Sequence, residues 1–339
     1  MEWVYQLREN IKKNVKFLYM DGKRILVTGG AGFIGSNIVE KLYYMPVKKI
    51  IVLDNLFAGK YSNICSFLGE KVQFINGDIR DTELLDKICK EIDIICHQAA
   101  WGSVPRSLVD PRSYHDNNVT GFFNILEVAR INNIKRVVYA SSSSVYGDEL
   151  NLPKKEERIG KALAPYGVSK YIDEVYADIY RRCYGLEVIG LRYFNVFGPR
   201  QNPEGDYAAV IPKFINLLLD KKPVVINGDG TYSRDFTYID NVVDFNMRCM
   251  ETTNEEVFGR VFNVACGNNY SLNDLVRILI DKIGEGKVIY GDKRKGDVEH
   301  SLADIELGRR LLGYEPRVLF DEGLGRTINY LRNKLKSPR

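Results

Sequence analysis

A short apolar run passes straight into three spaced glycines in Lys23-Arg24-Ile25-Leu26-Val27-Thr28-Gly29-Gly30-Ala31-Gly32-Phe33-Ile34-Gly35. The run has the length and the Ile/Val content of a buried strand. Gly29, Gly32 and Gly35 have the G-x-x-G-x-x-G spacing, which permits a tight turn and a close approach of the backbone to a ligand. A strand that ends in such a turn and enters a helix directs backbone N–H groups at a pyrophosphate. The stretch therefore predicts a dinucleotide-binding unit.

After this unit, strands and helices continue to alternate along the chain. Apolar segments rich in Val and Ile lie at 24–28, 49–54, 72–76, 92–97, 136–142 and 187–192. Helical patterns lie between them at 35–44, 82–90, 113–132 and 166–184. Strands that are apolar on both faces and alternate with helices predict an α/β fold, a Rossmann-type doubly wound parallel sheet.

The alternation breaks after Asn195. Loop-like segments rich in Pro, Gly and polar residues occupy 198–207 and 227–235, and helical patterns recur at 208–220, 240–251, 272–283 and 304–312. A late strand at 260–265 is expected to return to the main sheet. We expect a helical extension at 1–20, a cofactor-binding Rossmann domain at 21–195, and a smaller α/β substrate lobe at 196–339 interleaved with it.

An acidic residue ends the second predicted strand. Asp54 lies about 20 residues beyond the glycines, where a carboxylate accepts hydrogen bonds from the adenosine ribose and repels a 2′-phosphate. Asn55 follows it, and the next basic residue is Lys60, whereas an NADP site needs a nearby Arg. The pattern predicts NAD as the cofactor.

Two further strand ends can border the same cofactor. Asp78 and Ile79 follow the third predicted strand, where they border the adenine or, equally, Asp78 caps the next helix. Ala99 and Ala100 follow the fourth strand, and their small side chains leave room at the carboxyl edge of the sheet. Phe33 and Ile34 lie within the glycine fingerprint and belong to the same candidate site.

Tyr166 and Lys170 stand four residues apart, a spacing that places both side chains on one face of a helix. A phenol has an ordinary pKa near ~10, so it needs a neighbouring cation to act as a base at neutral pH. Ser142 closes the fifth predicted strand, where its hydroxyl can share a hydrogen bond with Tyr166 and a substrate oxygen or is simply a polar strand end. With the dinucleotide fingerprint, the three indicate an enzyme that moves hydride to and from a nicotinamide.

The bulk composition narrows the partners. The net charge is +4 without a long Lys/Arg block, which disfavours nucleic acid. The six cysteines form no C-x-x-C pair, which argues against a zinc site or a disulfide framework and favours reduced thiols in the cytoplasm. The first ten residues carry charges where a signal peptide needs an apolar run, and no run approaches the ~18 apolar residues of a membrane helix. No metal site is expected.

Five motifs in this order resemble the extended short-chain dehydrogenases/reductases that act on nucleotide sugars. They are the glycine fingerprint, His97-Gln98-Ala99-Ala100, Ser141-Ser142-Ser143-Ser144-Val145-Tyr146-Gly147, Tyr166-x-x-x-Lys170 and Arg192-Tyr193-Phe194-Asn195-Val196-Phe197-Gly198-Pro199. The match runs from about residue 23 to the C-terminus. Within the group, the chain most resembles the UDP-N-acetylglucosamine 4-epimerases.

The resemblance implies a role for particular positions. Tyr166 would be the base, Lys170 would stabilise its phenolate and hold the nicotinamide ribose, and Ser142 would complete the catalytic set. Tyr193 would join the cofactor site, and the 196–339 lobe would bind the nucleotide sugar. The substrate contacts that the resemblance implies are Ser103, Ser142, Ser143, Ser144, Asn195, Ala209, Val210, Asn227, Arg234, Asp297 and Ser301.

Two positions bear on the reaction and the sugar. Dehydratases of this superfamily carry an Asp-Glu pair where this chain has Ser143 and Ser144, so the resemblance disfavours dehydration. Ser301 stands where epimerases restricted to plain hexoses place a bulky Tyr, so a small residue implies room for an N-acetyl group. Alternatively, Ser301 caps the helix that follows from Asp304, or other residues fill the pocket.

The expected activity is therefore reversible, NAD-dependent C4 epimerisation of UDP-GlcNAc and UDP-GalNAc through a 4-keto sugar. A UDP-glucose or UDP-glucuronate 4-epimerase is the nearest alternative, and a nucleotide-sugar sensor without catalysis is the alternative of a different class. The resemblance also implies a homodimer paired through the helices at 113–132 and 166–184.

Overall fold

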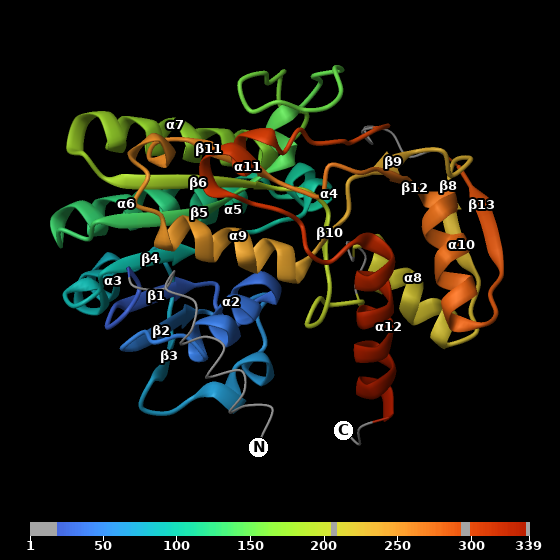
Figure 1. Ribbon diagram of the computed structural model, residues 1–339, viewed down its shortest axis with the longest axis horizontal. Coiled ribbons are helices and arrows are strands. Elements are labelled where there is room, and N and C mark those ends of the chain that lie inside the picture. The colour runs from blue at the N-terminus through green and yellow to red at the C-terminus, as the bar shows by residue number, and fades with distance from the viewer. Residues whose placement is uncertain (1–18, 205–208, 293–298, 337–339) are drawn as a thin grey trace.

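A seven-stranded parallel sheet forms the centre of the computed structural model, which describes residues 19–204, 209–292 and 299–336 (Figure 1). The strand order is β11-β6-β5-β4-β1-β2-β3. The strands are β1 Arg24–Thr28, β2 Lys49–Asp54, β3 Val72–Asn76, β4 Ile94–His97, β5 Arg136–Ser142, β6 Glu187–Tyr193 and β11 Val261–Val264. The predicted doubly wound α/β sheet is confirmed. Most of the expected extension at 1–20, and Asp297, lie outside the described residues.

The predicted strands match the observed ones closely. β4 begins two residues later than expected, because Asp93 turns its carboxylate back onto the N–H of Arg24 at 2.8 Å. β11 pairs in parallel with β6, in the register Val261 with Gly190, so the late strand does return to the main sheet. The C-terminal part of the chain therefore supplies an edge of the sheet whose other strands all lie within residues 24–193.

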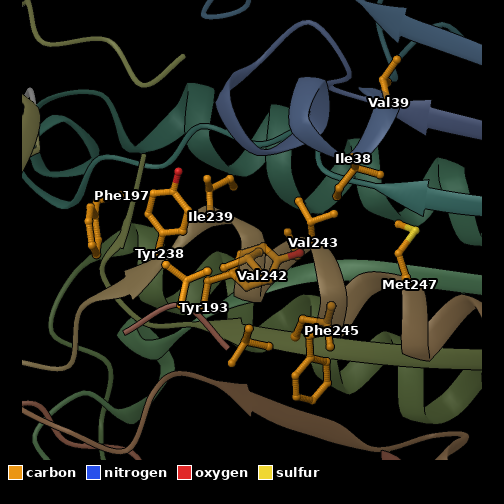
Figure 2. Close-up of a cluster of buried hydrophobic side chains, with 14 of the residues drawn as sticks. Ile38, Val39, Tyr193, Phe197, Tyr238, Ile239, Val242, Val243, Phe245 and Met247 are labelled. Atoms are coloured by element: carbon orange, nitrogen blue, oxygen red, sulfur yellow. The ribbon is translucent and has the colours of Figure 1, made fainter. Parts of the chain in front are cut away.

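Two helical layers cover the sheet. On one face, the apolar side chains of α2 Phe33–Tyr43 and α9 Ile239–Glu251 pack into the larger core. Figure 2 shows Val243 and Met247 of α9 near Ile38 of α2 in this core. The other face is covered by α3 Thr82–Cys89, α6 Gly121–Ile131 and α7 Pro165–Tyr184, which share a second core with residues of the sheet.

The helix expected at 113–132 is not continuous. It consists of α5 Pro111–Tyr114, a π-helical turn η4 His115–Thr120, and α6. The π-helical turn places Asn118 inside the protein, where its side chain bonds the backbone N–H and C=O of Trp101. π-helical turns often occur at functional sites, and this one fixes a loop at the carboxyl edge of the sheet.

The smaller lobe lies at the right of Figure 1, next to the carboxyl ends of the sheet strands. It contains a two-stranded parallel sheet that the sequence did not predict, β8 Val224–Asn227 with β13 Val288–Gly291, packed on helices.

The remaining elements of the whole protein are α4 Val104–Val109, β7 Val196–Phe197, α8 Val210–Leu219, β9 Ser233–Arg234, β10 Thr237–Tyr238, β12 Tyr270–Ser271, α10 Leu272–Ile283, α11 Glu306–Leu312, α12 Phe320–Lys336 and the short 3-10 turns η2 Tyr61–Asn63, η3 Cys65–Phe67, η5 Ser143–Tyr146 and η6 Glu255–Val257.

Part of the stretch at 227–235 that was expected to be a loop pairs as strand, since β9 and β12 form a short antiparallel ladder. Across the described ranges, no helix combines the length and the apolar character needed to cross a membrane.

Candidate active site

A cavity of about 740 Å³ lies over the carboxyl ends of the central strands. The turns and helices that follow β1, β2, β4, β5 and β6 all contribute to its lining, as expected at the ligand-binding edge of a doubly wound sheet. It brings together most of the predicted site residues: Gly29, Gly32, Phe33, Ile34, Gly35, Asp54, Asn55, Ile79, Ala99, Ala100, Ser142, Ser143, Ser144, Tyr166, Lys170, Tyr193, Asn195 and Ala209.

A second cavity of about 200 Å³ adjoins the first. The two share Ser143, Ser144 and Asn195, and the smaller one adds the predicted residues Arg234 and Ser301. The smaller cavity thus extends the larger one toward the C-terminal lobe. Predicted residues from both halves of the chain meet at Ser143 and Ser144.

Among the predicted residues that the structure describes, four line neither cavity: Asp78, Ser103, Val210 and Asn227. The Asp78 carboxylate is instead held by the Nε of Arg80 at 2.9 Å, and this bond lowers the pKa of Asp78 to about 2. The alternative that Asp78 caps a helix is wrong, because the cap of α3 is Asp81. Ser103 caps α4 through the N–H of Arg106.

The glycine turn after β1 fits a diphosphate. Gly29 has a positive φ of 63°, and a Cβ on it would lie 2.6 Å from the backbone N of Ala99. A Cβ on Gly32 would have only the Gly29 oxygen within 4 Å, at 3.1 Å, so the missing side chain leaves space where α2 begins. That space, bordered by a helix N-terminus with no side-chain cap, suits the anionic diphosphate of NAD.

Asp54 is fixed at the same end of the cavity. Its carboxylate accepts hydrogen bonds from the N–H groups of Ala31 at 3.0 Å and Leu56 at 2.8 Å. Burial raises the pKa of Asp54, while these backbone hydrogen bonds favour the charged form. A fixed acceptor that lines the cavity fits the hydroxyls of a ribose, as expected for NAD.

Tyr166 and Lys170 both lie on α7, which begins at Pro165. The fixed φ of proline suits the first turn of a helix, so the start of α7 is set next to Ser142 and the two cavities. Lys170 is only 1% exposed, and its ammonium donates to Oδ2 of the equally buried Asp173 at 3.0 Å. Ser142 Oγ accepts from the N–H of Ser144 at 3.1 Å.

A buried histidine completes the surroundings of Lys170. Burial, with the positive charge of Lys170, lowers the pKa of His97 to about 3. Its Nδ1 lies 2.8 Å from the hydroxyl oxygen of Thr28. His97 is therefore neutral at physiological pH, and Lys170 follows Tyr166 by one helical turn on α7.

A buried ion pair holds α7 against the sheet. Glu174 accepts from Arg192 of β6 at 2.9 Å and 2.7 Å, and from the hydroxyl of Ser141 on β5 at 2.5 Å. Glu174 lies one turn beyond Lys170 on the same face of α7. Sequence analysis did not single out this pair, although a charged residue on the inward face of a helix was a signal for it.

Ser301 lies on the segment that closes the smaller cavity. It is 9% exposed, and its N–H donates to the carbonyl of Ser233 at 3.0 Å. The alternative that Ser301 caps the next helix is wrong, because α11 begins at Glu306 and its N-cap residue is Ile305. Its small side chain is therefore available to line the pocket.

Comparison with known proteins agrees with this site. The model of the NAD dependent epimerase/dehydratase family matches residues 25–265. A putative UDP-glucose 4-epimerase of Methanocaldococcus jannaschii is 41% identical over 91% of this chain and 98% of its own length.

Two solved structures are also similar. A UDP-N-acetylglucosamine 4-epimerase from Methanobrevibacter ruminantium in complex with UDP-N-acetylmuramic acid is 38% identical, with a TM-score of 0.88 over 93% of this chain and all of that one. A UDP-glucuronic acid 4-epimerase from Bacillus cereus in complex with UDP-glucuronic acid and NAD is 32% identical, with a TM-score of 0.84 over 92% and 99%. The cofactor of this chain is NAD. The chain belongs to the NAD-dependent epimerase/dehydratase family, as an extended short-chain dehydrogenase/reductase of the nucleotide-sugar epimerase group.

Proposed function

We propose that the protein interconverts UDP-GlcNAc and UDP-GalNAc by inverting C4 of the sugar. The observation that carries this proposal is the small, buried Ser301 in the lining of the 200 Å³ cavity, which Ser143 and Ser144 also line. A small side chain there leaves volume for an acetamido group. The relatives named above act on UDP-glucose, UDP-GlcNAc and UDP-glucuronate, so relatedness supports the plain-hexose and uronate alternatives equally.

In this proposal Tyr166 moves the proton of the reaction. Its phenolate takes the proton from the 4-hydroxyl of the sugar, directly or through Ser142, and returns it when the opposite epimer forms. The buried side chain of Lys170 stabilises the phenolate electrostatically and would hold the ribose of the cofactor. Bound NAD would supply the hydride acceptor and donor for C4. The sugar passes through a 4-keto form and must turn over between the two transfers.

The two cavities suit a fixed nucleotide and a mobile sugar. In the proposal, Asn195 and Arg234 hold the diphosphate of the substrate, and an Arg guanidinium is well matched to phosphate oxygens. Ala209, which lines the larger cavity, contacts the nucleotide. Ser143 and Ser144 have only short side chains next to Tyr166, so they leave the ring free to rotate. No carboxylate stands at these two positions to help eliminate water, which favours epimerisation over dehydration.

The experiment that tests the proposal uses purified protein without added cofactor. The protein is incubated separately with UDP-GlcNAc, UDP-glucose and UDP-glucuronate, and the C4 epimers are followed by proton NMR. Conversion of UDP-GlcNAc to a mixture with UDP-GalNAc, faster than conversion of the other two sugars, is the expected result. Faster conversion of UDP-glucose or UDP-glucuronate would overturn the interpretation of Ser301. A protein that binds NAD and a UDP-sugar but converts none of the three would support the sensor alternative.

The helix that carries Tyr166, α7, and its neighbour α6 present apolar side chains to solvent. Phe123 of α6 and Tyr171, Val175, Tyr176 and Ile179 of α7 are each between 37% and 48% exposed. Contiguous exposed apolar side chains of this kind mark association surfaces. We propose that two copies pair through α6 and α7 as a homodimer. The cytoplasmic location stays a prediction from the sequence.

A further inference from the structure

Two aromatic rings and one guanidinium are stacked on the wall of the larger cavity. The rings of Phe57 and Trp101 lie 4.3 Å apart and 7° from parallel. The guanidinium carbon of Arg106 is 4.8 Å from the ring centre of Phe57 and 4.5 Å from that of Trp101. All three residues line the cavity. We call Phe57, Trp101 and Arg106 the aromatic clamp.

The strand order places the aromatic clamp across the glycine turn. Phe57 lies in the loop after β2, and Trp101 lies in the loop after β4. β1 stands between β4 and β2 in the sheet, so a contact between these two loops must cross the carboxyl end of β1. The glycine turn that fits the diphosphate begins at that end. The aromatic clamp therefore bridges the sheet edge directly over the dinucleotide site.

Both loops hold their rings in place. On the β2 side, Leu56 has a positive φ of 58°, which a non-glycine residue rarely adopts, and its N–H donates to the Asp54 carboxylate at 2.8 Å. The N–H of Phe57 donates to the side-chain oxygen of Asn55 at 3.1 Å. The same carboxylate that fits the cofactor ribose thus fixes the turn that directs Phe57 at Trp101.

On the β4 side, the Trp101 backbone is fastened twice by Asn118. The N–H of Trp101 donates to the Asn118 oxygen at 2.8 Å, and the Asn118 amide donates to the Trp101 carbonyl at 3.1 Å. The Asn118 amide also donates to Ser169 Oγ on α7 at 3.0 Å. Trp101 is therefore held by the helix that carries Tyr166, whereas Phe57 is the outer part of the aromatic clamp and is 49% exposed.

Arg106 has a charge that suits the cavity. Among the residues that the structure describes, its guanidinium makes no hydrogen bond and lies against the two rings, and its charge helps to lower the pKa of Asp110. A cation stacked on aromatic rings keeps its N–H donors at the ring edges, where they can meet an anion. A dinucleotide brings two negatively charged phosphates into this cavity.

We propose that the aromatic clamp retains the dinucleotide by closing over it, so that NAD leaves only when Phe57 separates from Trp101. An enzyme whose cofactor is restored in every cycle loses nothing by releasing it slowly. The inference requires bound NAD but no particular sugar, so it stands or falls independently of the proposed substrate.

The test measures the rate of NAD dissociation from the full-length protein. Each protein is saturated with NAD⁺, freed of excess by gel filtration, and mixed with an excess of 3-acetylpyridine adenine dinucleotide as a competing analogue. The NAD still bound is released by acid and quantified by chromatography at successive times. The variants are Phe57→Ala, which removes the outer ring, and Phe57→Tyr, which keeps it. Because Phe57 is half exposed, neither change opens a hole in the core.

Tyr61→Ala is the matched control. Tyr61 lies in the same loop region, is 50% exposed and has an edge contact with Phe74, but it lines neither cavity. Phe57→Ala should release NAD about tenfold faster than the unaltered protein, the effect of losing one ring stack and one cation–π contact. Phe57→Tyr and Tyr61→Ala should release it at the unaltered rate. Release from Phe57→Ala as slow as from Tyr61→Ala, or release from Phe57→Tyr as fast as from Phe57→Ala, would overturn the proposal.

Discussion

Buried, neutral His97 should make the protein sensitive to acid. Burial and Lys170 lower the pKa of His97 to about 3 from an ordinary value of 6.5. In the unfolded chain the ring takes up a proton near pH 6.5, whereas in the folded chain it stays neutral down to about pH 3. Between these values the unfolded state binds more protons, so the stability that this residue confers is complete above pH 6.5 and declines as the pH falls.

The magnitude follows from the same two values. At about pH 4.5, two units below the unfolded pKa, the folded protein has lost roughly 3 kcal/mol through this one ring, since each pH unit costs about 1.4 kcal/mol. His97→Gln removes the titrating group and keeps a polar side chain near the Thr28 hydroxyl. The variant should lose roughly 3 kcal/mol less stability than the unaltered protein between about pH 7.5 and pH 4.5.

The assay is urea denaturation of both proteins at the two pH values, with the same NAD concentration throughout. Only the difference between the two pH dependences is used, so a general loss of stability in the variant does not affect the result. His115→Gln serves as the control for the loss of a histidine from an exposed position. If His97→Gln and the unaltered protein decline in parallel, His97 is not held neutral in the folded protein.

Four further changes test the site, the ion pair and the surface. Tyr166→Phe should lower kcat at least about 100-fold while bound NAD stays unchanged; turnover near the original rate would remove Tyr166 as the base. Ser301→Tyr should depress turnover of UDP-GlcNAc more than that of UDP-glucose, and equal losses measured by NMR would contradict its role. Glu174→Ala leaves Arg192 buried without the carboxylate that pairs with it, and it should lower the free energy of unfolding, measured in urea, by about 3–5 kcal/mol. A loss below about 1 kcal/mol would show that the pair is not buried in solution. Val175→Arg places a charge in the exposed apolar face and should give monomers in analytical ultracentrifugation, where dimers at the original affinity would exclude this surface.

The sheet could be predicted from sequence because its strands are buried on both faces. Runs such as the one at 49–54 leave no alternative to a strand bounded by turns, and their ends place Asp54 and Ser142 without further information. Periodicity could not predict the π-helical turn, because one extra residue in a helical turn leaves no local sequence pattern. The turn is stabilised instead by the hydrogen bond between Asn118 and the Trp101 backbone, which is distant in the chain. The pairing of β8 with β13 was missed for the same reason, since some sixty residues separate these short strands.

The sequence predicted site residues where a motif fixes the backbone. It did not predict contacts between segments that are distant in the chain. Tyr166 and Lys170 were predictable from one helical spacing. Asp78 itself does not line the cavity, although its neighbours Gly77 and Ile79 do, and its place beside the adenine stays a prediction. The stacking of Phe57 on Trp101 joins loops from two strands that are not adjacent in the sheet, and neither loop alone indicates it.

The position of β11 also has a consequence for biosynthesis. Some seventy residues separate β6 from the strand that covers its edge, so a ribosome translating about 5–20 residues per second leaves that edge bare for several seconds. During that interval the nascent chain exposes unpaired N–H and C=O groups along β6, next to Tyr193 and the incomplete nucleotide pocket. Slow codons or a chaperone at that stage would decide how much of the newly made chain reaches the native sheet. A gene split between β6 and β11 would yield two fragments, neither of which contains the complete edge of the sheet.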